Sequence, residues 1–406
     1  MAGAARTQGA GMTETVLAAD ETVLGVVDVA WGNITEGGKV IGTEHLLTGI
    51  AELAEETTAG RALYAAGATE TAQLAVVRER ERGHGPRAVT AAVGWLSGDG
   101  RDTGADVAQV LTGQAEPGRP LSGAAVRAFT AARELAGRDG GAEFTAGHLL
   151  RALLTDGANR ATETLAGCGI TPGQVLARLD ARDYEPAEDG LDRALWPTRD
   201  VLLGRPVQGD VPFLWRQVFT LTRGVNLATA PVVWTAWDAR EQARALGHRR
   251  GTEHILLALL ATYEAGRVHP HLAGEGGLTP EERLAGGARL ARQGLDHATV
   301  RRALAQAPEL GKDDEHLDEY LNDARKAATT GPLLDALLRG RNRAGRLLAS
   351  LGYVPDAKDK SDDDGDDESG LAAELLDALD AGWVLDIAPV GGKQIRKLWR
   401  FLRDSD

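Results

Sequence analysis

Apolar residues recur every three or four positions through most of the chain, and this spacing is typical of amphipathic helices. Val23, Val26, Val27 and Ala30 form one such apolar face. The same windows are rich in Ala, Leu, Arg and Glu, which favour helices, whereas the alternating β-branched pattern of strands is scarce. The pattern therefore predicts an all-α fold.

Several helix starts are marked by their capping residues. Thr171-Pro172-Gly173-Gln174 and Thr279-Pro280-Glu281-Glu282 each place Thr at the N-cap, Pro at the first helical position and Gln or Glu three residues after the cap. These side chains satisfy backbone N–H groups that the first turn of a helix leaves without partners. We therefore predict that helices begin at both places.

One short motif recurs along the chain. Gly42-Thr43-Glu44-His45-Leu46-Leu47 returns as Gly251-Thr252-Glu253-His254-Ile255-Leu256-Leu257. A weaker copy is Thr145-Ala146-Gly147-His148-Leu149-Leu150, and a degraded one is Thr329-Thr330-Gly331-Pro332-Leu333-Leu334. Each copy is followed by a segment that ends in glycine. The chain is therefore interpreted as four helical repeats arranged in two pairs.

The length of 406 residues favours more than one hydrophobic core. A stretch with three prolines and Asp-Gly pairs separates the two repeat pairs. The predicted divisions are a first domain with repeats 1 and 2 at 14–182, a linker at 183–210, a second domain with repeats 3 and 4 at 211–356, an acidic linker at 357–370 and C-terminal amphipathic helices at 371–406.

Charge and composition narrow the range of partners. The net charge of −14 repels phosphate and anionic lipid, so we expect no nucleic acid as a partner, and a membrane is not a default partner of the whole chain. Cys168 is the single cysteine, which excludes an internal disulfide and a multi-cysteine zinc site. No apolar run approaches the roughly 18 residues of a membrane span, and no secretory signal is evident at the start. We therefore expect a cytoplasmic protein.

The repeated motif resembles a known family. Gly-Thr-Glu-His-Leu-Leu, preceded by Ala243-Arg-Ala-Leu-Gly-His248 and followed by a helix ending in Leu-Gly, is similar to the Clp repeat. In that family, two repeats form the small all-helical N-terminal domain of Clp-type AAA+ unfoldases. The resemblance implies two such domains here, each a pseudo-twofold pair of helical repeats. Gly391-Gly392-Lys393-Gln394 lacks the spacing and the hydroxyl of an ATPase phosphate loop, so a binding role without the motor is expected.

The resemblance also implies a ligand site. Domains of this family recruit substrates and adaptors, some bind phosphorylated arginine, and related ones are targets of antibacterial cyclic peptides. By position, Glu44 and Glu253 keep the carboxylate that contacts the guanidinium group. Ser122 and Thr229 keep the hydroxyl that contacts the phosphate, Thr229 only with one residue deleted before Gly251.

The chain departs from the family pattern at several of these positions. Asp20 stands where the first repeat should offer a hydroxyl, and Gly147 replaces the glutamate of the second repeat. The aromatic residue that precedes the hydroxyl in the family is replaced by Ala19, Leu121 and Ala228. Without that ring, a platform for peptide ligands is lost.

The motif residues also have purely structural interpretations. Thr43 is a good N-cap, Glu44 in the first turn interacts favourably with the helix dipole, and His45 is interpreted as a core hydrogen-bonding residue. For the two motif glutamates, a functional and a structural role remain equally open. A carboxylate at a helix N-terminus can pair with an arginine, which is the chemistry of a guanidinium receptor.

Three other features are given structural interpretations. His269-Pro270-His271 is predicted to be a mobile surface loop rather than a metal site, because it lacks the helical spacing of zinc ligands. Cys168 is predicted to be a buried thiol. Trp196 and Trp215 either anchor the linker or form an exposed binding spot, and anchoring is preferred. We find no catalytic constellation, and expect no enzyme, cofactor or metal.

The end of the chain carries a basic amphipathic pattern. The apolar face consists of Ile395, Leu398, Trp399 and Leu402, and the basic residues beside it include Arg396 and Arg400. Such a helix docks on a partner, on its own protein or on an anionic membrane. It is predicted to be a partner-binding tail.

Two hypotheses for function follow. The first is a non-enzymatic adaptor or decoy of the Clp protease system that captures peptide, phospho-arginine or antibacterial-peptide ligands through Glu44 or Glu253, with Ser122 or Thr229 supplying a hydroxyl. The expected partners are peptides, proteins or the Clp unfoldase itself. The second is an interaction scaffold that reuses the repeat fold, with the basic C-terminal helix docking a partner or a membrane surface.

Overall fold

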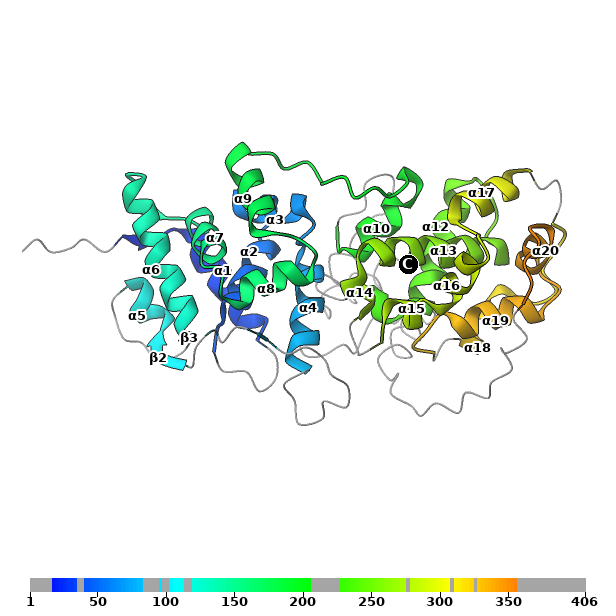
Figure 1. Cartoon of the computed structure of the whole chain (residues 1–406), viewed down its shortest axis with the longest axis horizontal. Coiled ribbons are helices and arrows are strands. Elements are labelled where there is room, and N and C mark those ends of the chain that lie inside the picture. Colours follow the sequence, from blue (N-terminus) through cyan, green and yellow to red (C-terminus); the bar gives the residue numbers. More distant parts are fainter. Residues whose placement is uncertain are drawn as a thin grey trace, which may run out of the picture. The chain divides into compact units, whose positions relative to one another are not determined.

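The computed structural model describes residues 17–34, 40–82, 95–96, 99, 102–112, 119–205, 226–274, 278–306, 310–324 and 327–355. These residues are mostly helical, as the apolar spacing predicts, and their few strands are short (Figure 1). The acidic linker and the partner-binding tail, with Ile395, Leu398, Trp399, Leu402, Arg396 and Arg400, lie outside the described residues. Trp215 also lies outside them.

The described residues form two compact units. The first unit comprises those within 1–62, 97–162 and 179–182, and the second comprises those within 63–96, 163–178 and 183–406. Two of the dividing points fall inside helices, α3 (Thr58–Ala66) and α8 (Arg160–Gly167). A third falls within α9 (Pro172–Ala181). The domain boundaries taken from the repeats therefore stay a prediction.

The first unit consists of two helix pairs. Helix α1 (Glu21–Gly32) packs on α2 (Thr43–Glu52), and α6 (Gly123–Arg138) packs on α7 (Ala146–Thr155). Helix α2 also contacts α7, so the pairs share a core that contains the fully buried side chains of Ile50, Phe129 and Leu150. The remaining elements are a short helix and two two-stranded sheets: α5 (Val107–Thr112), the parallel pair β1 (Ala18–Ala19) and β4 (Glu143–Phe144), and the antiparallel pair β2 (Asp102–Asp106) and β3 (Pro120–Ser122).

The second unit is built around α13 (Thr252–Val268). This helix packs against α12 (Pro231–Ala245), α16 (Ala285–Arg292), α17 (His297–Gln306) and α20 (Arg343–Ser350). The apolar run that follows its Thr-Glu-His start is buried on every face, as expected for the central helix of a bundle. The other elements are α4 (Glu70–Arg82), η1 (Arg193–Leu195), α10 (Trp196–Leu202), η2 (Leu227–Thr229), α14 (Pro270–Gly274), α15 (Pro280–Arg283), α18 (Leu317–Ala324) and α19 (Gly331–Arg339).

The first part of the predicted linker is folded. Leu195, Val201 and Leu202 are buried, and Arg199 binds the carboxylate of Asp189 at 3.1 Å. The indole N–H of Trp196 donates to the backbone of Leu191 at 3.2 Å, while Arg199 lies over its ring. These contacts join Trp196 to residues of the predicted linker itself, so its anchoring against a domain stays a prediction. Residues up to 205 belong to the second unit.

The prediction of a mobile surface loop around His269 is wrong. His271 lies in α14, and burial lowers its pKa to about 3. His269 ends α13 and contacts the carboxylate of Asp189 at 3.2 Å. Helix α13 extends to this point and α14 begins at Pro270, so the two histidines are half-buried where these helices meet instead of lying on a surface loop. Cys168 is a buried free thiol, as predicted.

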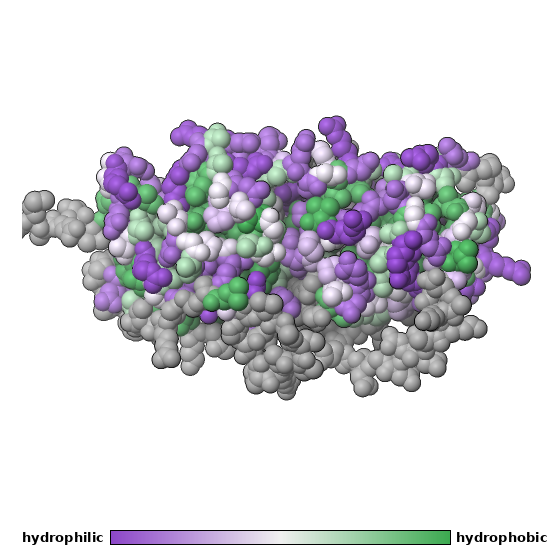
Figure 2. All heavy atoms as spheres, in the orientation of Figure 1, coloured by the Kyte–Doolittle hydropathy of each residue, from purple (hydrophilic) through white to green (hydrophobic). Residues whose placement is uncertain are grey.

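Among the described residues, no three His, Cys, Asp or Glu side chains gather as a metal site would require. No helix among them has the length and apolarity to cross a bilayer. The face shown in Figure 2 mixes hydrophilic and hydrophobic residues.

Candidate functional site

The Gly-Thr-Glu-His motif begins a helix in each unit. Gly42 is the N-cap of α2 and Gly251 is the N-cap of α13. The backbone N–H of each glycine donates to Nδ1 of the histidine three residues later, at 3.0 Å for His45 and 3.1 Å for His254. The structural interpretation of the histidine is therefore confirmed. The prediction that Thr43 is the N-cap is wrong, because the histidine caps the helix from inside and the glycine takes the cap position.

The glycine leaves room for the glutamate two residues later. A Cβ atom at Gly42 would lie 2.2 Å from Oε2 of Glu44, and one at Gly251 would lie 2.5 Å from Oε2 of Glu253. In α7 the cap is Thr145, which carries a Cβ atom, and Gly147 occupies the position of the glutamate. A glycine at the N-cap therefore occurs together with a glutamate whose carboxyl group folds back toward that cap.

Each motif glutamate is fully buried and holds an arginine of the same unit. Oε1 of Glu44 lies 2.9 Å from Nη1 of Arg160, the first residue of α8. Oε1 of Glu253 lies 2.8 Å from Nη2 of Arg343, the first residue of α20. The arginine side chains are 31% and 25% exposed, whereas both glutamate side chains are 0% exposed. The guanidinium groups therefore lie on the solvent side of each pair.

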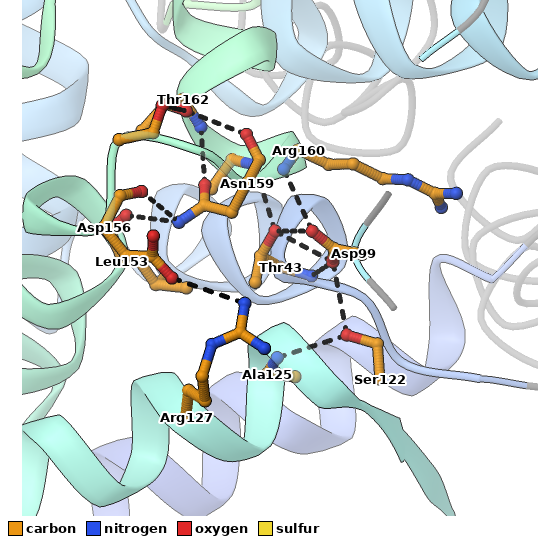
Figure 3. A network of polar contacts seen from close by, with 12 residues as sticks. Thr43, Asp99, Ser122, Ala125, Arg127, Leu153, Asp156, Asn159, Arg160 and Thr162 are labelled. Atoms are coloured by element: carbon orange, nitrogen blue, oxygen red, sulfur yellow. Dashed lines mark hydrogen bonds and ion pairs between the residues drawn. The ribbon is translucent and has the colours of Figure 1, made fainter. Parts of the chain in front are cut away.

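An aspartate joins the starts of the two helices in the first unit (Figure 3). The carboxylate of Asp99 accepts from the backbone N–H of Thr43 at 2.6 Å and from that of Arg160 at 3.0 Å. It also accepts from the hydroxyl of Thr43 at 2.9 Å and from that of Ser122 at 3.2 Å. The Thr43 hydroxyl in turn accepts from Ala161 N–H at 3.1 Å. We call Thr43, Glu44, Asp99 and Arg160 the first junction.

The second unit repeats this arrangement with different residues. Asp313 accepts from the backbone N–H of Thr252 at 3.3 Å, from its hydroxyl at 2.7 Å and from the backbone N–H of Arg343 at 2.7 Å. The Thr252 hydroxyl accepts from Ala344 N–H at 2.9 Å. We call Thr252, Glu253, Asp313 and Arg343 the second junction. In both junctions the aspartate carboxylate accepts hydrogen bonds from N–H and hydroxyl groups. Beside it, the guanidinium group of the arginine contacts the carboxyl group of the glutamate.

Burial dominates the electrostatics of the first junction. Loss of water, reinforced by the charge of Asp99, raises the pKa of Glu44 to about 8 although Arg160 opposes the shift. Burial also lowers the pKa of His45 to about 4. His45 is therefore neutral at physiological pH, which agrees with its Nδ1 accepting a hydrogen bond.

The two predicted hydroxyl residues have different surroundings. Ser122 is the N-cap of α6, where its oxygen accepts from Ala125 N–H at 3.2 Å and donates to Asp99. Thr229 lies in η2 and donates to the backbone oxygen of Asn226 at 2.7 Å, because Ala230 takes the N-cap of α12. The structure thus brings Ser122, but not Thr229, into the described contacts of a junction.

Four residues of the junctions were not identified from the sequence, although the sequence carries a signal for two of them. Asn159-Arg160-Ala161 and Asn342-Arg343-Ala344 are identical triplets that begin α8 and α20. Each asparagine oxygen caps its helix, accepting from Thr162 N–H at 3.0 Å and from Gly345 N–H at 2.8 Å. The shared triplet could have indicated both arginines. Asp99 and Asp313 have no flanking pattern in common.

Neither comparison with known proteins identifies a relative of this chain. A scan against models of protein families finds no match, and a search of the curated proteins finds none.

Proposed function

We propose that this chain is a non-enzymatic binding protein of the Clp-repeat type, an adaptor or decoy that captures peptides or proteins through arginine side chains, including phosphorylated ones. The resemblance of the Gly-Thr-Glu-His helices supports the family, and the chemistry of the two junctions supports the ligand. Glu44 and Glu253 supply the carboxyl oxygens, and an incoming guanidinium group would favour the ionised form of Glu44, whose pKa burial raises to about 8.

One observation carries this proposal. Each motif glutamate already holds a guanidinium group at hydrogen-bonding distance, 2.9 Å in the first junction and 2.8 Å in the second. Immediately beside it, N–H and hydroxyl donors hold a carboxylate. A phosphorylated arginine side chain joins a guanidinium group and an anion in one molecule. The glutamate of each junction therefore suits the guanidinium group of such a ligand, and the N–H and hydroxyl donors suit its anionic phosphate.

Calorimetric titration with phospho-arginine and with an arginine-rich peptide tests the proposal. We expect weak binding to the wild-type protein that is lost in the double variant Glu44→Gln, Glu253→Gln. The exposed residue Glu143 provides a matched control, and Glu143→Gln should bind like the wild type. Heat that is unchanged in the double variant would contradict a role for the two carboxylates.

The filled state of both junctions favours a second candidate, the interaction scaffold. Arg160 and Arg343 already occupy the glutamates, and Ser122 is engaged with Asp99. A scaffold would bind partners elsewhere, for example through the basic pattern of the C-terminal tail. Binding of a purified Clp-type unfoldase to the full chain and to a chain stopped at Gly370 separates the candidates. Loss of binding on truncation supports the scaffold, whereas retained binding contradicts the tail as its docking surface.

A further inference from the structure

We infer that a hollow between α19, α20 and the strap formed by residues 353–355 is a docking site for an acidic segment that carries leucines, and that residues 356–376 of this chain occupy it. The two helices pack on each other in the second unit (Figure 1). The hollow has a volume of about 440 Å³, within the range of about 300–1,000 Å³ that ligand pockets span. No residue of the second junction belongs to its described lining, so failure of this docking would leave the proposed function untouched.

The turn between α19 and α20 is strongly basic, although the net charge of the chain is −14. Residues 339–346 read Arg-Gly-Arg-Asn-Arg-Ala-Gly-Arg, so four of these eight positions are arginine. Arg343 is held by Glu253 at 2.8 Å, whereas Arg341 and Arg346 line the hollow. The hollow therefore presents two guanidinium groups to a ligand.

These two guanidinium groups meet no carboxylate in the described part of the chain. Arg346 donates instead to the backbone oxygens of Leu310, Arg341 and Lys312. Arg341 is exposed, and its backbone N–H, not its guanidinium group, donates to the carboxylate of Asp314 at 2.7 Å. Backbone oxygens carry no net charge, so both positive charges stay available to the carboxylates of a ligand.

The rest of the lining is mainly apolar. Leu348 and Tyr353 are buried, Leu338 is half-buried and Pro355 is exposed. Apolar side chains of a ligand gain free energy when they cover such a surface. A ligand that fits the whole hollow must therefore combine acidic groups with apolar side chains, whereas phosphate alone would use only the basic part.

The strap that contributes Tyr353 and Pro355 is fixed to the bundle. The side-chain amide of Gln293 donates to the backbone oxygen of Val354 at 2.6 Å and accepts from its N–H at 3.0 Å. The N–H of Tyr353 donates to the backbone oxygen of Leu348 at 3.0 Å. Pro355 is the last described residue and lines the hollow. The rest of the chain therefore starts beside the hollow.

The sequence that follows the strap has the composition that the hollow requires. Residues 356–368 contain eight acids and two lysines. Leu371, Leu375 and Leu376 come next, with Glu374 among them. The acids complement the two guanidinium groups, and the leucines suit the apolar lining.

The covalent connection favours this segment over one from another molecule. Leu371 follows Pro355 by 16 residues, and a short tether gives an effective concentration on the order of 1 mM. An acidic segment of a partner must compete with that concentration. We therefore expect the chain itself to fill the hollow in the isolated protein.

Hydrogen exchange of the full chain, measured by mass spectrometry, tests the docking. We expect the amides of 356–376 to exchange at least about threefold slower than the rates of an unstructured chain. In Arg341→Glu they should approach those rates, because the acids then face a negative charge. Arg267→Glu is the matched control, since Arg267 is an exposed residue of α13 outside the lining, and it should behave like the wild type.

Two results of this experiment would overturn the docking. One is exchange of 356–376 at unstructured rates in the wild type, and the other is slow exchange that Arg341→Glu leaves unchanged. The amides of α13 and α20 in the same data show whether Arg341→Glu is folded, because they should exchange as in the wild type.

A synthetic peptide with the sequence of residues 356–376 decides which segment occupies the hollow. It is titrated by calorimetry into the wild type and into a variant that carries Asp362→Ser, Asp363→Ser, Asp364→Ser, Asp366→Ser and Asp367→Ser. We expect the wild type to bind it about tenfold more weakly than the variant, because its own segment competes. Equal affinity would overturn self-occupation and show a hollow open to a partner, and binding to neither chain would overturn the site itself.

Discussion

The glycine before each Thr-Glu pair is required by the space that the carboxylate occupies. The φ angles of Gly42 and Gly251 are −92° and −146°, which other residues adopt freely, so backbone strain plays no part. The requirement comes instead from Oε2 of the glutamate, which lies where a Cβ atom would be. The space around the N-cap position, and not its backbone conformation, therefore requires glycine.

Substitution of Gly251 tests that explanation. In Gly251→Ala the new Cβ atom would lie 2.5 Å from Oε2 of Glu253 and 2.8 Å from Nη1 of Arg343. We expect the free energy of unfolding to fall by about 1–3 kcal/mol, as for other overpacked sites. Denaturant unfolding measures the change. Gly173→Ala, inside α9, has nothing within 4 Å of its new atom and should gain up to about 1 kcal/mol, because Ala favours a helix over Gly. Equal losses in the two variants would refute the steric account.

Glu44 predicts a pH dependence with a definite sign. Burial raises its pKa from 4.5 to about 8, so the folded protein holds this proton more tightly than the unfolded chain does. The stability that Glu44 contributes is complete below pH 4.5 and is lost as pH rises through about 8. In Glu44→Gln this contribution is absent.

Denaturant unfolding of both proteins between pH 5 and about 9 checks this prediction. The difference in unfolding free energy between Glu44→Gln and the wild type should grow in favour of the variant as pH rises. Other titrating groups cancel in that difference. A constant difference across the range would show that Arg160 fully compensates the buried charge.

At the scale of elements, an aspartate from a distant segment caps two helices at once. Asp99 accepts from the first N–H of α2 and from the first N–H of α8. Neither helix supplies this cap from its own sequence, since Gly42 has no side chain and Asn159 bonds further along α8. The two helix starts are therefore held together by one carboxylate.

Removal of that carboxylate should be costly. Asp99→Ala leaves buried N–H and hydroxyl groups without an acceptor, so we expect a loss of about 2–3 kcal/mol in unfolding free energy. Asp180→Ala removes an exposed ion pair with Arg151 in the same unit and should cost less than about 1 kcal/mol. Thermal and denaturant unfolding measure both. Similar losses would mean that Asp99 is no more than a surface charge.

The sequence allowed the elements to be predicted better than the junctions. Apolar spacing and caps such as Thr279 with Glu282 indicate helices because those interactions are local, and the capping pair is present in the structure. The position of Ser122 in the repeat predicts a ligand-binding hydroxyl, a role that stays a prediction, and in the structure this hydroxyl caps α6 and contacts Asp99. Asp99 lies 56 residues from Thr43, and nothing local marks a residue whose partners are that distant. The loop around His269 was wrong because a long buried helix, α13, continues to it.

At the scale of the whole molecule, each compact unit draws on distant parts of the sequence. Residues 183–205, expected to be part of a linker, are fastened to the second unit by buried leucines, by the hydrogen bond from Thr198 to Asp238 at 2.9 Å and by the contact of His269 with Asp189 at 3.2 Å. Arg205 also donates to the backbone oxygen of Tyr64 at 3.2 Å. Prolines and Asp-Gly pairs predict turns, but they do not indicate whether those turns pack against a folded unit.

Hydrogen exchange tests how firmly this segment is held. Arg199→Ala removes two ion pairs and the contact with the Trp196 ring, so the amides of α10 should exchange at least about tenfold faster, the equivalent of about 1.4 kcal/mol. Arg193→Ala removes only an exposed arginine over the same ring and should change exchange little. Unchanged protection in Arg199→Ala would assign the anchoring to the leucines and to the contact of Thr198 with Asp238.

The distance along the chain between each glutamate and its arginine has a consequence for fragments of the protein. Glu44 and Arg160 are 116 residues apart, so a fragment that ends between them would keep a buried acid without its arginine. A gene fragment cut between the acid and its base should yield insoluble halves that regain solubility only when expressed together.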